Sequence, residues 1–295
     1  MSKIKKILLS FICLPIIGGV LYGATYVNKV KEEYVQAIKI NDVNINTTKK
    51  AAVLKVEKEK IAIVAQKPTP EVKTETKKQV KTPIIKKPSG KVIVIDPGHA
   101  SVTSMEKEQQ APGSNIMKIK EPGGAEGINT KTPEYLVNMA VAVKLKGLLE
   151  KKGYTVIMTK TENKQMLGNI ARAKIGNTSK ADLVIRIHAD SNDNSSVKGA
   201  SMLVPADTKN TNAIYKTSKR YGEIVLNSLI GVGMKNRGVV ERNDLTGFNW
   251  SVVPVILVEM GFQSNVEEDK QLTNVNYQSR LSKALSEGIH KALIE

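Results

Sequence analysis

The sequence predicts an α/β fold, in which a single domain from residue 91 onward has a mostly parallel, mixed sheet flanked by helices on both faces. Two observations predict this class. Apolar runs of strand length alternate with longer helical patterns from Lys91 to the end of the chain. The first run, Val92–Ile95, is entirely β-branched and has no polar face, as expected of a strand that helices cover on both sides.

The elements of this domain are expected in a regular order. Strands are predicted at 92–95, 155–159, 183–187, 199–204 and 255–259, with Val239 as a candidate for an edge strand. Helices are predicted at 132–152, 165–177, 212–229 and 276–294. The first helix has a clear start, because Thr132 suits the N-cap and Pro133 suits the first helical position. Gly153 then ends it.

The first 27 residues are predicted to be a membrane segment. Three lysines lie in residues 1–6, and residues 7–27 carry no charge over a length close to that of a bilayer-spanning helix. Signal cleavage needs small residues at the last and third-last positions before the cleaved bond. A site after Ala24 would place the large residue Tyr22 at the third-last position. We therefore expect a retained single-pass anchor with the domain outside the cytoplasm. The alternative is a cleaved signal peptide, which would make the protein secreted.

Residues 28–90 are predicted to form a basic linker. They are rich in Lys, Glu, Thr and Pro and lack the apolar content that a core requires. The formal net charge is +17, and 18 lysines against 7 acidic residues lie before residue 91. We expect this segment to contact anionic wall polymers or lipid headgroups. Nucleic acid is not an expected partner, because zinc knuckles, interleaved aromatic residues and a recognition helix are missing from the sequence.

Three ionisable residues lie at or near predicted strand ends in the folded part. His99 follows the first strand after Asp96-Pro97-Gly98, and His188 follows the third. Glu259 lies within an apolar run, where a lone carboxylate is costly unless it is paired, bound to a metal or functional. Ligands of open α/β sheets bind at the carboxyl ends of the strands. Cys13 is the only cysteine, so a metal in this domain must use histidine and carboxylate ligands.

A hydrolytic zinc site takes three protein ligands and leaves one position for water. The two histidines supply two of them, whereas His290 is assigned to the surface of the last helix. Glu134, in the first turn of a predicted helix, is a candidate third ligand, although the helix dipole alone also favours an acid there. Four further glutamates in the preceding loop are rivals: Glu106, Glu108, Glu121 and Glu126. Asp96 either orients a ligand histidine or caps the turn.

Several ordered motifs together carry a family resemblance from about Lys91 to Glu295. They are Val94-Ile-Asp-Pro-Gly-His99, Pro133-Glu-Tyr-Leu-Val-Asn138, Lys152-Gly-Tyr-Thr-Val-Ile-Met-Thr159, Arg172, Ile187-His-Ala189, Gly199-Ala200 and Val258-Glu-Met-Gly-Phe-Gln-Ser-Asn265. This set resembles the zinc-dependent N-acetylmuramoyl-L-alanine amidases of the amidase type 3 family. The resemblance implies that His99, Glu134 and His188 bind one zinc ion and that Glu259 is the catalytic carboxylate.

The sequence departs from the common family pattern at two places. Arg186 and Asp190 replace a serine and an asparagine that usually flank the second histidine, and the loop Ser101–Lys131 is longer than usual. Arg186 either contacts Glu259 or a substrate carboxylate, or forms a structural ion pair at the sheet edge. The loop either lines or covers a substrate cleft, or is a tolerated surface insertion. Asn249 and Trp250, shortly before the Glu259 strand, are candidate substrate contacts, although a lone Trp is as often part of a core.

The resemblance implies hydrolysis of peptidoglycan at the amide bond between N-acetylmuramic acid and L-alanine, with zinc as cofactor and Glu259 as general base. We expect a monomer. Two alternatives remain at this stage: a wall-binding or regulatory protein of the same fold without turnover, and a zinc peptidase that cuts within stem peptides.

Overall fold

The structure is a computed structural model that describes residues 90–295. The predicted membrane segment 7–27 and residues 28–89 of the predicted linker lie outside the described residues. Within residues 90–295, the structure contains no helix with both the length and the apolar character needed to cross a membrane.

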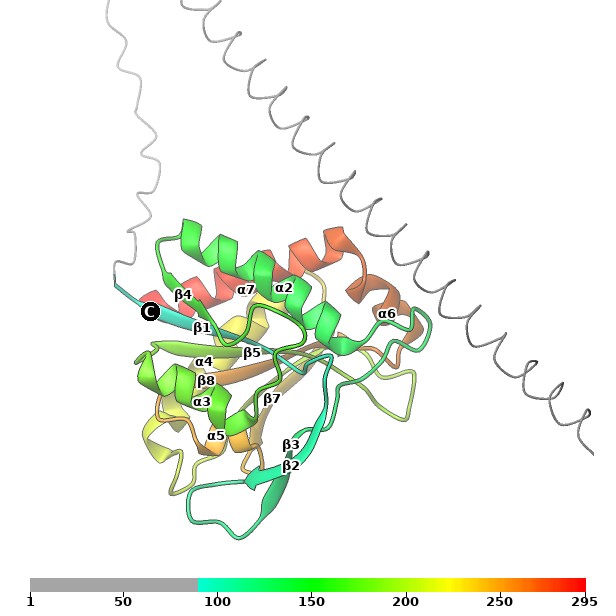
Figure 1. The fold of residues 1–295 in the computed structure, drawn as a ribbon. Coiled ribbons are helices and arrows are strands. Elements are labelled where there is room, and N and C mark those ends of the chain that lie inside the picture. The colour runs from blue at the N-terminus through cyan, green and yellow to red at the C-terminus, as the bar shows by residue number, and fades with distance from the viewer. Residues whose placement is uncertain (1–89) are drawn as a thin grey trace, which may run out of the picture. The chain divides into compact units, whose positions relative to one another are not determined.

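The centre of the domain is a six-stranded sheet with the strand order β4-β1-β5-β8-β6-β7 (Figure 1). Four neighbouring strands are parallel to one another: β4 (Thr155–Met158), β1 (Val92–Pro97), β5 (Leu183–Asp190) and β8 (Val255–Phe262). The next strand, β6 (Ala200–Pro205), is antiparallel to β8, and β7 (Asn236–Arg242) pairs with β6 in parallel. The predicted α/β fold with a mixed sheet is therefore confirmed.

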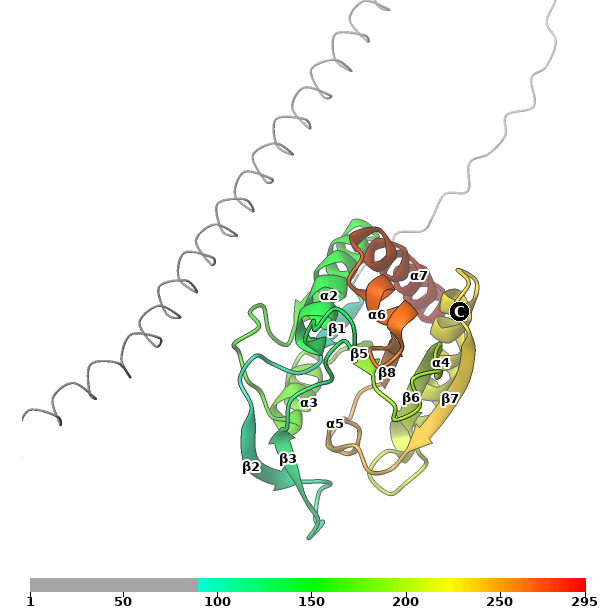
Figure 2. The ribbon, with the colours of Figure 1, turned by 90° about the vertical axis from the view of Figure 1, so that its right-hand side faces the viewer.

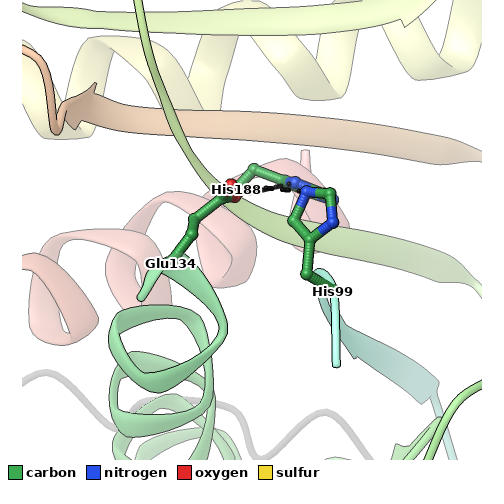
Figure 3. A group of neighbouring side chains, drawn as sticks. All are labelled: His99, Glu134 and His188. Atoms are coloured by element: carbon green, nitrogen blue, oxygen red, sulfur yellow. Dashed lines mark hydrogen bonds and ion pairs between the residues drawn. The ribbon is translucent and has the colours of Figure 1, made fainter. Parts of the chain in front are cut away.

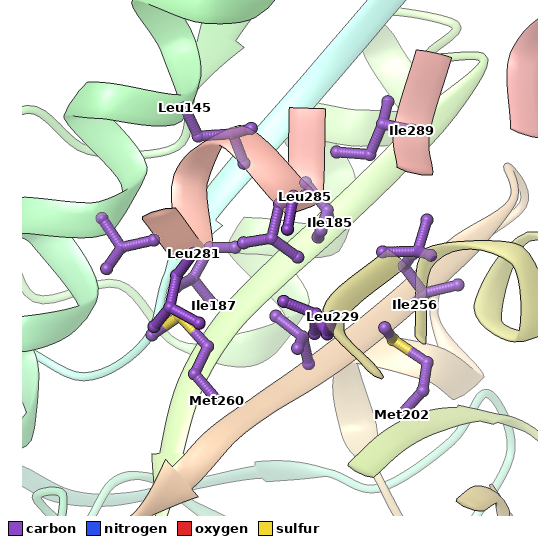
Figure 4. Packing of buried hydrophobic residues seen from close by; sticks show 14 of the residues in the cluster. Leu145, Ile185, Ile187, Met202, Leu229, Ile256, Met260, Leu281, Leu285 and Ile289 are labelled. Atoms are coloured by element: carbon purple, nitrogen blue, oxygen red, sulfur yellow. The ribbon is translucent and has the colours of Figure 1, made fainter. Parts of the chain in front are cut away.

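One face of the sheet is covered by three long helices (Figures 1 and 2). They are α2 (Glu134–Lys151), α4 (Asn212–Ile230) and α7 (Val275–Ile294). Aliphatic side chains from these helices and from the sheet form the main core, including Leu145, Leu229, Leu285, Ile185 and Ile256 (Figure 4). Because burial of one such side chain contributes about 1.5–3 kcal/mol, this face holds the sheet in place without many aromatic residues.

The opposite face carries a smaller core beneath two short helices. α3 (Asn169–Thr178) and α5 (Thr246–Asn249) cover it, and the buried cluster includes Val94, Val184 and Phe248. A last short helix, α6 (Val266–Leu272), follows β8. Helices on both faces of the sheet agree with the prediction.

The long loop 101–131 contains structure that the sequence pattern did not predict. It holds an antiparallel hairpin of β2 (Ser104–Gln109) and β3 (Met117–Glu121). The helix start also differs from the prediction. The first helical residue is Glu134, and Pro133 occupies the N-cap position without a side-chain cap. Thr132 is not the N-cap, because its carbonyl oxygen accepts from the backbone N–H of Gly127 and the side-chain amide of Gln263.

The parallel register brings the predicted site residues to one edge of the sheet. β1 and β5 are parallel, and Pro97 and Ile187 are their last paired residues. His188 comes directly after this pair on one chain segment and His99 two residues after it on the other, so both lie at the same end of the sheet. In the next pair of strands, His188 is the register partner of Glu259. The fold thus places both histidines and Glu259 at the carboxyl edge, where α/β sheets carry their sites.

Candidate metal centre

His99, Glu134 and His188 form a compact group at this edge (Figure 3). One ligand atom from each residue lies within 4.8 Å of the others. The three side chains come from different elements, since His99 follows β1, Glu134 begins α2 and His188 belongs to β5. The two imidazole rings meet edge to face, with centroids 4.9 Å apart. The predicted three residues are therefore brought together, although their separation in sequence is large.

The donor atoms of this group lie close enough to share one metal ion. Nε2 of His99 lies 3.3 Å from Oε2 of Glu134, and Nδ1 of His188 lies 3.1 Å from Oε1 of Glu134. Ligand atoms that share a tetrahedral zinc at about 2.0–2.1 Å are separated by about 3.3 Å. The two-histidine, one-carboxylate set also matches the ligand chemistry of hydrolytic zinc sites. The donor types therefore suit zinc, and the donor atoms lie close enough, within 4.8 Å of one another, to share one ion.

Glu134 is held as a carboxylate by its surroundings. Its Oε2 accepts from the backbone N–H of Ala125, and its Oε1 accepts from Asn138 and from the backbone N–H of Ala189. Burial opposes ionisation, but the hydrogen bond and charge of His188, with the charge of His99, outweigh it and lower the pKa of Glu134 to about 2. Burial also lowers the pKa of His188, which favours the neutral ring that a metal requires.

His99 adopts a backbone conformation that few residues other than glycine adopt. Its φ of 57° lies in the left-handed region. The side chain of Lys160, which is only 1% exposed, donates from Nζ to the carbonyl oxygen of His99. Burial and the neighbouring charge of Arg172 lower the pKa of Lys160 to about 8. Sequence reasoning did not single out this lysine, because its contact with His99 spans 61 residues.

Two glycines allow the ligand side chains to approach the backbone. A Cβ atom on Gly98 would lie 2.3 Å from Cε1 of His188, and one on Gly124 would lie 2.6 Å from Oε2 of Glu134. Both contacts are far shorter than van der Waals distance, so the site requires residues without side chains at these positions.

Glu259 lies in β8 beside the group of three. Its Oε2 atom is buried and has no hydrogen-bond partner among the described residues. Burial, reinforced by the negative charges of Glu134 and Asp190, raises the pKa of Glu259 well above its ordinary value, although Arg186 and Arg242 oppose this. A carboxyl group with an unsatisfied oxygen and a raised pKa has the properties of a proton acceptor and donor in catalysis.

Asp96 and Arg186 belong to a buried ionic network instead of the metal centre. Asp96 accepts from Thr159 Oγ1 (2.6 Å), Arg172 Nη1 (2.6 Å) and Arg186 Nε (2.8 Å). Arg186 also donates to Asn169. Among residues 90–295, no hydrogen bond joins Asp96 to either ligand histidine, so it does not orient one directly. Of the two interpretations of Arg186, these contacts are those of the structural ion pair.

Glu121 takes the position next to His99 that was expected of Asp96. Nδ1 of His99 and Oε1 of Glu121 are 2.8 Å apart. The other three rival glutamates lie elsewhere: Glu106 pairs with Lys120 on the surface, Glu108 binds the start of α3, and Glu126 is exposed. Four glutamates in one loop look alike in the sequence, and only the fold distinguishes them.

Asn249 and Trp250 hold the hairpin through polar contacts with its backbone. The indole Nε1 of Trp250 donates to the carbonyl of Gln109, and the side chain of Asn249 donates to the carbonyl of Gln110. These contacts give both residues a structural role, which the sequence did not predict. Their contact with substrate stays a prediction. The two hydrogen bonds also show that the long loop is anchored to the domain.

A family model described as N-acetylmuramoyl-L-alanine amidase matches residues 93–291, and this chain belongs to that family. It is similar to the N-acetylmuramoyl-L-alanine amidase LytC of Bacillus subtilis, with 24% identity over 97% of this chain and 51% of the relative. It is also similar to the N-acetylmuramoyl-L-alanine amidase AmiC of Escherichia coli O6:H1, with 27% identity over 67% of this chain and 52% of the relative. The chain thus spans about half the length of these curated relatives.

The fold is shared with solved structures. The amidase Ami1 of Mycobacterium abscessus in its apo form superimposes with a TM-score of 0.64 and 23% identity, over 70% of this chain and 99% of that one. At this identity the likeness establishes the common fold of the domain.

Proposed function

We propose that this protein is a zinc-dependent N-acetylmuramoyl-L-alanine amidase. It hydrolyses the amide bond between the lactyl group of N-acetylmuramic acid and the L-alanine of the peptidoglycan stem peptide. The observation that carries the proposal is the juxtaposition of a group with zinc-ligand spacing and a buried, unpartnered carboxyl oxygen on the adjacent strand. Family membership supports the choice of this amide bond.

His99, Glu134 and His188 would hold the zinc ion. Zinc at this position supplies Lewis-acid chemistry, because it polarises a carbonyl and makes a water molecule more acidic. Glu134 remains ionised, and burial favours the neutral ring of His188, so the site offers a carboxylate and imidazole nitrogen to a cation.

Glu259 performs the proton transfers. Its free Oε2 accepts the proton of the attacking water, and the same group then protonates the departing amine of L-alanine. The raised pKa of the metal-free group suits the second step, in which the carboxyl group must be an acid. A nearby dication would lower this pKa and so favour the first step.

The test of this function is the identification of products from purified wall sacculi by mass spectrometry. The amidase releases intact stem peptides that begin with a free L-alanine and leaves the sugar strands unbroken. Shortened stem peptides would instead identify a zinc peptidase. Binding to sacculi without any released product would identify a non-catalytic wall protein.

We also propose that the protein acts outside the cytoplasm as a membrane-anchored monomer. The proposal rests on the uncharged segment 7–27 and on the basic, Pro-containing segment 28–90, which suits an extended linker near anionic wall polymers or lipid headgroups. Fractionation of cells that produce the full chain tests it. Recovery in the membrane fraction, with accessibility to external protease, is expected. Release into the medium would indicate a cleaved signal peptide.

A further inference from the structure

We propose that Glu121, carried by the hairpin β2–β3, is a positioning residue for His99. Its carboxylate holds the imidazole as the Nδ1–H tautomer and thereby leaves the lone pair of Nε2 directed at Glu134. The inference rests on the proposed metal site, because the Nε2 lone pair is the donor that zinc would use. It assigns a purpose to the hairpin of the long loop, whose later residue Ala125 already donates to Glu134.

The contacts of Glu121 require it to be the acceptor. The residue is 3% exposed, and its Oε1 lies 2.8 Å from Nδ1 of His99 and 3.2 Å from the backbone nitrogen of Gly123. Its Oε2 lies 3.5 Å from Nη2 of Arg172. An N–H group and a guanidinium can only donate, so the carboxylate faces donors on both oxygens. The proton shared with His99 therefore belongs to the imidazole.

The tautomer of His99 decides whether the site has a donor for a metal. Nε2 of His99 already lies 3.3 Å from Oε2 of Glu134. With the proton on Nε2, the ring would donate to Glu134, and this contact would consume both the nitrogen lone pair and a carboxylate lone pair. With the proton on Nδ1, both remain available to a cation. An outer carboxylate that fixes a ligand histidine in this way typically strengthens metal binding by about 10–100-fold.

The hairpin is anchored independently of the site, as a positioning element must be. Glu108 of β2 accepts from the backbone N–H groups of Asn169 (2.6 Å) and Ile170 (3.1 Å) at the start of α3. Near its turn, the hairpin is bound by Trp250 and Asn249 through backbone carbonyls. These anchors fix β2, and the side chain of Asn169 donates to the carbonyl of Lys120 in β3. The framework that holds the Glu121 carboxylate beside His99 therefore does not depend on that contact.

Two buried glutamates on one hairpin provide a matched comparison. Glu121→Ala removes the contact with His99, and the isosteric Glu121→Gln removes the charge of this side chain. Glu108→Gln changes a buried carboxylate whose hydrogen bonds go to the start of α3. The full chain has three histidines, so long-range ¹H–¹⁵N NMR with histidine-selective labelling reads the tautomer of each ring in metal-free protein. Competition with a chromophoric chelator measures zinc affinity on the same samples.

We expect Nδ1 of His99 to carry a proton in the wild type, where it faces Oε1 of Glu121. Glu121→Ala should shift this proton to Nε2 and weaken zinc binding about 10–100-fold. Glu121→Gln should give a mixture of the two His99 tautomers, since an amide can both donate and accept. This variant provides the test if the alanine variant does not fold. Glu108→Gln should lower thermal stability and leave the tautomer and the zinc affinity near wild type.

Three results would overturn the proposal. They are an Nε2–H tautomer in the wild type, an unchanged tautomer in both Glu121 variants, and an equal effect of Glu108→Gln, which would mean that the hairpin acts only as a structural support. The tautomer is measured without metal or substrate. A wild-type protein that releases no L-alanine peptides would therefore contradict the proposed function and leave this inference standing.

Discussion

Replacement of Asp96 by asparagine should destabilise the domain more than any change at an exposed ion pair. Asp96 is fully buried and accepts three hydrogen bonds of 2.6–2.8 Å, two of them from the guanidinium groups of Arg172 and Arg186. In Asp96→Asn, the amide N–H₂ group faces one of these donors. Both arginines then lose the carboxylate that they share, although Arg172 keeps Glu121, whose Oε2 lies 3.5 Å from its Nη2.

The expected loss follows from the burial of all three partners. Arg172 and Arg186 are 3% and 7% exposed, so water cannot replace the lost charge. Removal of one partner from a buried ion pair costs about 3–5 kcal/mol, which is a large part of the 5–15 kcal/mol that stabilises a typical domain. Asp244→Asn is the matched control, because Asp244 binds Arg242 with two hydrogen bonds but its side chain is 39% exposed. Exposed pairs contribute at most about 1 kcal/mol.

Urea unfolding of residues 90–295, followed by circular dichroism, measures both changes. The Asp96 variant should unfold at a much lower urea concentration with an unchanged slope, and the Asp244 variant should remain close to the unsubstituted domain. A decrease of about 1 kcal/mol or less in the free energy of unfolding of both variants would contradict this reasoning. The buried network around Asp96 would then contribute no more to stability than an exposed ion pair.

Two further predictions concern groups that contact the metal centre. Glu134 has an ordinary pKa of 4.5 and a folded pKa of about 2, which corresponds to about 3 kcal/mol of stability in the metal-free protein. Because the folded pKa is the lower one, this stability is present above pH 4.5 and is lost as the pH falls towards 2. The free energy of unfolding of Glu134→Gln, measured over that pH range, should not show this decrease. Lys160→Met removes the donor to the carbonyl oxygen of His99 and should weaken zinc binding in a chelator competition, while Lys160→Arg should retain much of it. Equal zinc affinity in the methionine variant would show that the left-handed backbone at His99 needs no support from Lys160.

Much of the fold follows from the sequence because its signals are local. Runs such as Val92–Ile95 mark strands by themselves, and parallel strands end at the same edge. That rule is enough to bring His99, His188 and Glu259 together before any coordinates are known. The hairpin at 104–121 gave no such signal, because its strands are short, only partly buried and mixed in polarity.

The parts of the site that could not be predicted depend on contacts distant in sequence. Asp96 lies three residues before His99, and this proximity suggested that it orients the ring. The fold instead directs Asp96 to two arginines that are 76 and 90 residues away. Glu121, 22 residues from His99, takes the place beside the ring because the hairpin turns it back towards the site. Neither pairing has a periodicity or a spacing from which it could be read.

The central claim is that Glu259 transfers protons in a zinc amidase, and one measurement tests it most directly. Wild-type and Glu259→Gln proteins, matched for zinc content by elemental analysis, are incubated with purified sacculi, and the stem peptides with free amino-terminal L-alanine are quantified. We predict one zinc per chain in both proteins, release of these peptides by the wild type, and loss of release by at least about 100-fold in the variant. Comparable release by the zinc-loaded variant would contradict the assignment of Glu259, and absence of these peptides with the zinc-loaded wild type would contradict the proposed activity.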